Sequence, residues 1–141
     1  MSDFYKYFKQ NMDGLGLPAP ESLFGSVQTA VGNLTVILAN IDKFGKTVTV
    51  GEVIGATTKL ERLGAVATLS ASFYVGACIG SLAVATGRDI AGGTSLADVL
   101  SFARQNHISR PWLASALHSW PGVHRSNVQR RAHYKYLAAN K

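Results

Sequence analysis

The chain has 141 residues and a net charge of +6; 47% of its residues are hydrophobic and only 16% are charged. The high hydrophobic fraction excludes a disordered chain. The charged fraction is unusually low for a soluble domain, because such domains typically carry about 25% charged residues. The one cysteine, Cys78, excludes an internal disulfide framework and a zinc site made from several thiolates.

The positive charge is concentrated in the second half of the chain. Residues 1–62 carry six basic and six acidic side chains, whereas residues 63–141 carry eight basic and two acidic ones. No acidic residue follows Asp98, and the same tail holds all four histidines and both tryptophans. A basic, aromatic tail indicates a polyanionic partner, either an anionic membrane surface or a nucleic acid. The candidates for contact with an anionic surface are Arg125, Arg130, Arg131 and Lys135.

The first 20 residues are predicted to form an aromatic-basic arm and a linker. Residues 4–9 combine aromatic and basic side chains and could form one short helix, whereas the glycines and prolines of residues 13–20 favour a linker. The opening residues contain no apolar core of the kind found in signal peptides, so we expect no secretory signal peptide.

A first uncharged segment, residues 22–41, has the periodicity of a helix. Its large apolar residues recur at steps of three and four, at Phe24, Val27, Val31, Leu34, Leu38 and Ile41. The opposite side is polar but uncharged, which is unusual for a helix side that faces water. As a helix the segment would extend about 30 Å, which is about the thickness of a hydrocarbon core. We therefore expect a membrane-competent helix whose polar side supplies the candidate pore-lining residues Gln28, Thr29 and Asn33.

The next segment is predicted to contain a turn and a shorter helix. The turn is expected at residues 42–46 and an amphipathic helix at residues 47–62, although the alternation at residues 47–50 is also compatible with a strand. The sequence from position 40 to Thr47 is similar to a P-loop, but Asn40 stands where that motif requires its first glycine. We therefore predict no nucleotide site here.

The second uncharged segment, residues 63–87, is the most informative part of the chain. These 25 residues would extend about 37 Å as one helix and exceed a hydrocarbon core of about 30 Å. Small residues recur at every fourth position, which is the pattern of a glycine zipper that lets helices approach closely in lipid. The zipper residues are Gly64, Thr68, Ser72, Gly76 and Gly80, and Thr68 and Ser72 are also candidate pore-lining residues. The central helix of a soluble bundle would show the same pattern, so both interpretations stay open.

The remainder, residues 91–141, is predicted to be a basic helical region. Ser95 and Asp98 resemble a capping box at the start of one helix. A second helix is expected at residues 111–120 and a third at residues 126–139.

The predicted fold class is mainly α. We expect a helical bundle or a helical hairpin with two uncharged, membrane-competent helices and a basic helical C-terminal part. The expected organisation is an N-terminal arm and linker at residues 1–20, a membrane-competent helical region at 21–90 and the basic helical region at 91–141.

The sequence lacks the patterns of known catalytic and metal sites. The four histidines have no paired metal-ligand spacing, no nucleophile elbow is present, and Cys78 lies inside an apolar run. We therefore predict that the protein is not an enzyme and uses no metal or cofactor.

The neutral helical segment and the zipper residues, in a chain that opens MSDFYKYFKQNMDGLGLPAP, resemble the small pore-forming antibacterial effectors of the type VI secretion system. The resemblance implies a toxin that is made in the cytoplasm, carried by the haemolysin-coregulated tube protein and secreted without a signal peptide. Such toxins insert into the inner membrane of the recipient cell, oligomerise there and conduct small ions, which collapses the membrane potential. The resemblance also implies a cognate membrane immunity protein in the producing cell.

Two other functions are compatible with the same sequence. The basic tail, spread over three short helices, fits a soluble helical module that binds nucleic acid, although its basic residues do not gather on an evident recognition helix. A membrane-seated immunity or partner protein would also contain uncharged helical segments. We expect the membrane, and not nucleic acid, to be the partner.

Overall fold

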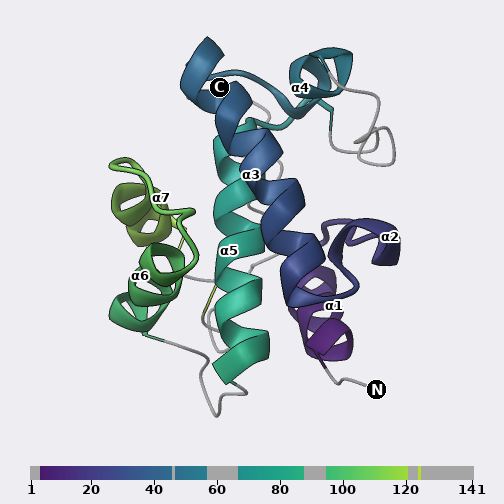
Figure 1. Ribbon diagram of the computed structural model, residues 1–141, viewed down its shortest axis with the longest axis vertical. Coiled ribbons are helices and arrows are strands. Elements are labelled where there is room, and N and C mark those ends of the chain that lie inside the picture. The colour runs from purple at the N-terminus through teal and green to yellow at the C-terminus, as the bar shows by residue number, and fades with distance from the viewer. Residues whose placement is uncertain (1–3, 46, 57–66, 88–94, 121–123, 125–141) are drawn as a thin grey trace.

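The computed structural model of the protein describes residues 4–45, 47–56, 67–87, 95–120 and 124. These residues form α-helices, and no β-strand is present among them (Figure 1). The helices are α1 (Phe4–Gly14), α2 (Glu21–Phe24), α3 (Val27–Phe44), α4 (Val50–Ala56), α5 (Ala71–Gly87), α6 (Leu96–Gln105) and α7 (Leu113–Ser119). The predicted mainly α fold class is confirmed.

The helix α5 is the centre of the molecule. It contacts α1, α3, α4, α6 and α7, and Figure 1 shows α3 crossing in front of it with α6 and α7 on one side and α1 on the other. Every residue from Phe73 to Ala83 is buried. A helix that is apolar on all sides must be covered on all sides, and the other helices provide this cover.

The expectation of one continuous helix over residues 63–87 is wrong over residues 67–70, and residues 63–66 lie outside the described residues. Residues 67–69 form a turn and a bend, and Ser70 forms an isolated antiparallel bridge with Thr49. The Ser70 hydroxyl then accepts a hydrogen bond from the Phe73 N–H at 3.2 Å, which caps the first turn of α5. The alternating residues 47–50 contribute this single bridge and no strand, and α4 begins at Val50.

The expected helix over residues 22–41 is divided in two. α2 ends at Phe24, and Ser26 caps α3 because its hydroxyl accepts a hydrogen bond from the Thr29 N–H at 3.1 Å. α3 then continues through part of the predicted turn and ends at Phe44. The next residue, Gly45, caps the helix with a φ of 100°. Of the predicted apolar side, Phe24, Leu34, Leu38 and Ile41 are buried, and Val27 and Val31 are half-buried.

The N-terminal residues are packed into the core. α1 lies against α5, and the aromatic rings of Phe4, Phe8, Phe24 and Tyr74 follow one another with centroids 5.7, 5.0 and 6.5 Å apart. The Asn11 side chain donates a hydrogen bond to the Ser81 hydroxyl at 2.8 Å, between α1 and α5. The Tyr74 hydroxyl donates to the Pro18 carbonyl, also at 2.8 Å. These contacts fix both α1 and the following residues against α5.

The C-terminal helices start as the sequence indicates. The Ser95 hydroxyl accepts a hydrogen bond from the Asp98 N–H at 3.2 Å, which confirms the predicted cap of α6. α7 begins at Leu113, two positions after Pro111. The third helix predicted at residues 126–139 lies outside the described residues.

The helices in the described ranges differ from membrane spans in length and hydropathy. None of these helices is both long enough and apolar enough to cross a membrane. The expectation of two membrane-competent helices is therefore not met by the helices of this structure. α5 has only 17 residues, and the 18 residues of α3 include several polar side chains as well as Asp42 and Lys43.

Candidate functional site

The candidate functional site is the enclosed apolar helix α5. Its 17 residues contain no charged side chain. Cys78 is fully buried, and burial raises the pKa of its thiol far above the usual range, although a hydrogen bond with Tyr74 acts in the opposite direction. Burial also raises the pKa of the Tyr74 hydroxyl well above its usual value. α5 is therefore uncharged over the whole physiological pH range.

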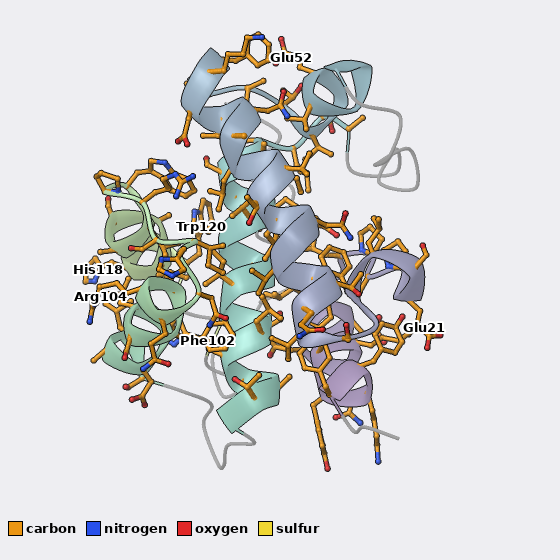
Figure 2. The ribbon with its side chains drawn as sticks, in the orientation of Figure 1. Glu21, Glu52, Phe102, Arg104, His118 and Trp120 are labelled. Carbon is orange, nitrogen blue, oxygen red and sulfur yellow. The ribbon has the colours of Figure 1, made fainter. Side chains whose placement is uncertain are left out.

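The helices α1, α3, α6 and α7 form a sheath around α5, and each turns an apolar side toward it. The buried sheath residues include Phe8, Met12, Leu34, Leu38, Val99, Ala103, Leu113 and Leu117. Arg104 and His118 are exposed on the outer side of α6 and α7, as Figure 2 shows, whereas the Trp120 ring meets the Phe73 ring edge-on at 5.3 Å. The sheath thus separates an apolar interior from a polar exterior.

The predicted zipper residues do not form one ridge in this structure. Ser72, Gly76 and Gly80 lie on α5, but Thr68 is exposed in the turn before it, and Gly64 lies outside the described residues. A Cβ atom added to Gly76 would meet no atom within 4 Å. Since no helix approaches closely at Gly76, this glycine is not required for packing in the folded protein.

The five candidate pore-lining residues are also placed apart. Gln28 and Thr29 are exposed in the first turn of α3, Thr68 is exposed before α5, and Ser72 is half-buried on α5. The expectation that Asn33 shares the outer polar side of α3 is wrong, because only 4% of Asn33 is exposed.

Asn33 faces the interior of the protein because it satisfies a buried carbonyl group. Its Nδ2 donates a hydrogen bond to the Leu23 carbonyl at 2.9 Å and so joins α3 to α2. Its Oδ1 is buried and has no hydrogen-bond partner. A buried unpaired acceptor opposes folding, so Asn33 contributes less stability than a fully paired amide would.

The basic residues assigned to an anionic surface cannot be placed. Arg125, Arg130, Arg131 and Lys135 lie outside the described residues. Within the described part of the tail, Arg104 is exposed, and the Arg110 guanidinium is paired with the Asp42 carboxylate.

Sequence reasoning missed the contact between the starts of α4 and α5. Thr49 and Glu52 form a capping box: the Glu52 carboxylate accepts from the Thr49 N–H at 2.8 Å, and the Thr49 hydroxyl accepts from the Glu52 N–H at 3.2 Å. The spacing of these two residues would have identified this cap and the start of α4. No local signal indicates that Thr49 pairs with Ser70.

Within the described ranges, no group of three or more His, Cys, Asp or Glu side chains is placed to hold a metal ion. Comparisons of the chain with protein-family models, with curated proteins and with solved structures found no match.

Proposed function

We propose that this protein is an antibacterial toxin that inserts into the inner membrane of a recipient cell and forms an ion-conducting pore. The observation that carries the proposal is α5, an uncharged helix that contacts α1, α3, α4, α6 and α7 and is buried along most of its length. All backbone hydrogen bonds of a helix interior are made within the helix itself, so such a helix can exchange a protein core for lipid without exposing polar backbone groups.

The energy of this exchange is small. The strongly apolar residues of α5 are Phe73, Val75, Ile79, Leu82 and Val84. At about −0.3 to −0.6 kcal/mol each, they contribute together about −1.5 to −3 kcal/mol to insertion, and the glycines and serines of α5 offset part of this. A helix with this composition is compatible with the protein core and with the bilayer. Its packing against the sheath helices determines which of the two environments it occupies.

The delivery and partners follow from the resemblance to type VI effectors. We propose that the toxin is carried by the haemolysin-coregulated tube protein and that a cognate membrane immunity protein protects the producing cell. In the bilayer, copies of the chain would associate through Gly76 and Gly80, because small residues allow helices in lipid to pack closely. The ions would pass along polar, uncharged side chains such as Ser72 and Thr29.

Expression in bacteria tests this proposal. The chain is produced with and without a periplasmic signal sequence, and the membrane potential is followed with a potential-sensitive dye. The proposal predicts loss of potential and of viability when the chain is exported. Normal growth and normal potential in both cases, with the protein present at the membrane, would contradict it.

The role of Gly76 in the pore is tested separately. Gly76→Leu should reduce ion leak through liposomes at least ten-fold if two helices pack at this position. Gly76→Ala is the matched control, because its added Cβ meets no atom within 4 Å in the folded protein. Equal leak from Gly76→Leu and the wild type would remove Gly76 from the pore interface.

A further inference from the structure

The starts of α4 and α5 are joined by three backbone hydrogen bonds. These run from Val50 N–H to Leu69 O (2.9 Å), from Gly51 N–H to Ala67 O (2.9 Å) and from Ala71 N–H to Val48 O (2.8 Å). Thr49 and Ser70 face each other as the bridge pair between these bonds. Figure 2 shows Glu52, which closes the cap on Thr49, at the end of the molecule where α4 begins. We call residues 48–51 and 67–71 the latch.

The latch determines the length of α5. As it stands, α5 has 17 residues and extends about 26 Å, which is shorter than a hydrocarbon core of about 30 Å. Residues 67–70 are uncharged, and adding these four residues to α5 would give about 32 Å. Four residues therefore separate a buried core helix from a helix that spans a bilayer.

The latch and the longer helix exclude each other, because they use the same backbone groups. In a helix that starts at residue 67, the Ala67 carbonyl would accept from the Ala71 N–H, and the Leu69 carbonyl from the Phe73 N–H. In this structure both carbonyls accept from α4 instead, and the Ala71 N–H donates to Val48. The change replaces the bonds of the latch with bonds inside the longer helix. It leaves the Val50 and Gly51 N–H groups and the Val48 carbonyl to pair with water, and it adds the uncharged hydroxyl groups of Thr68 and Ser70 to the helix.

We propose that the latch is a conformational switch: while Thr49 pairs with Ser70, α5 stays short and enclosed, and release of the pair lets residues 67–87 form one membrane-spanning helix. This inference rests on the proposed pore-forming function and adds to it the segment that controls insertion.

A disulfide across the latch tests the switch. The bonds that flank Thr49 and Ser70 make them a non-hydrogen-bonded antiparallel pair, whose Cα atoms lie about 4.5 Å apart, within the range of a disulfide. Thr49→Cys and Ser70→Cys are combined with Cys78→Ala, so that no other thiol is present. Leak is measured with potassium-loaded liposomes carrying a valinomycin-set potential, before and after reduction of the confirmed cross-link. The Cys78→Ala protein under the same redox conditions is the control.

The switch predicts at least ten-fold less leak from the oxidised protein. After reduction the leak should recover to at least the level of the Cys78→Ala control, because the cysteines also remove the hydroxyl caps of Thr49 and Ser70. Equal leak from the oxidised and reduced forms would overturn the switch and leave the pore intact. Absence of leak from the wild type, from the control and from the reduced protein would overturn the proposed function and the switch with it.

A pair of glycine variants tests the same switch without a cross-link. A Cβ added to Gly51 would lie 3.1 Å from both the Ala67 carbonyl oxygen and the Ala67 Cβ, so Gly51→Ala pushes the two halves of the latch apart. Gly55→Ala is the matched control on the same helix, because its Cβ would meet no atom within 4 Å. The Gly51→Ala protein should reach half-maximal leak at a several-fold lower concentration than the Gly55→Ala protein. If the two variants reached half-maximal leak at the same protein concentration, the switch would be contradicted.

Discussion

The Arg110 guanidinium forms a bidentate ion pair with the Asp42 carboxylate, with Nη2–Oδ2 and Nε–Oδ1 distances of 2.9 Å. The pair joins the loop between α6 and α7 to the last turn of α3, 68 positions away in the chain. Its position ties the C-terminal part of the sheath to the helix that crosses α5.

The pair is expected to stabilise the fold by about 0.5–1 kcal/mol, because its geometry is bidentate and the Arg110 side chain is only 23% exposed. Urea unfolding of Arg110→Met, Asp42→Asn and the double variant measures the coupling energy. The exposed Lys9–Asp13 pair on α1 is the matched control and should show weaker coupling. A coupling energy no larger than that of the control pair would contradict this account.

The buried hydrogen bond of Asn33 predicts a second effect on stability. Asn33→Ala should lower the free energy of unfolding by about 1–2 kcal/mol, because it leaves the Leu23 carbonyl without its donor. The loss is moderated because the variant also removes the unpaired Oδ1. Gln28→Ala on the exposed side of α3 should change stability by less than about 0.5 kcal/mol. Equal effects in thermal or urea unfolding would show that Asn33 does not join α3 to α2.

The end of α6 offers a stabilising substitution. His107 has a φ of 61°, and the hydrogen bonds from Ile108 N–H to Ala103 O (2.9 Å) and from His107 N–H to Arg104 O (3.2 Å) form a Schellman motif. Glycine adopts this conformation without the steric cost that an L side chain incurs. His107→Gly should therefore raise the free energy of unfolding by about 0.5–1 kcal/mol. An unchanged or lower value would indicate that the His107 side chain makes a compensating contribution.

The buried thiol of Cys78 predicts a loss of stability at alkaline pH. In the unfolded chain this thiol deprotonates around pH 9.0, whereas burial raises its pKa far above that value in the folded protein. Above pH 9 the folded state thus holds one more proton than the unfolded state, so stability falls by about 1.4 kcal/mol per pH unit from this group.

Urea unfolding between pH 7 and pH 10 measures this dependence, with Cys78→Ala as the control. The difference in unfolding free energy between the two proteins should change by about 1.4 kcal/mol in favour of Cys78→Ala over this range. A constant difference would show that the thiol does not titrate on unfolding in this range.

The sequence predicts the composition of the helices better than it predicts their ends. The apolar spacing identifies the inner side of α3, and the Ser95 cap identifies the start of α6, because both signals are local. The interaction that fixes the start of α5 is not local in the sequence. It is the pairing of Ser70 with Thr49, which lies 21 positions earlier in the chain. Residues 63–87 contain no charged side chain that would mark the start of α5, so the sequence predicts one helix over the whole segment.

In the candidate site, too, the sequence predicts local properties but not the contacts between helices. The absence of charge along α5 is visible in the sequence, whereas the sheath that encloses it is a property of the tertiary structure. The inward position of Asn33 depends on the carbonyl of Leu23 in another helix, and periodicity alone assigned it to the polar side.

The central claim is that this chain makes lipid bilayers permeable to ions without any other protein. The most direct measurement adds the purified wild-type protein, over a range of protein-to-lipid ratios, to potassium-loaded liposomes with a valinomycin-set potential. The account predicts that the potential collapses in a dose-dependent manner. A potential that persists at every ratio, while the protein is bound to the liposomes, would contradict it.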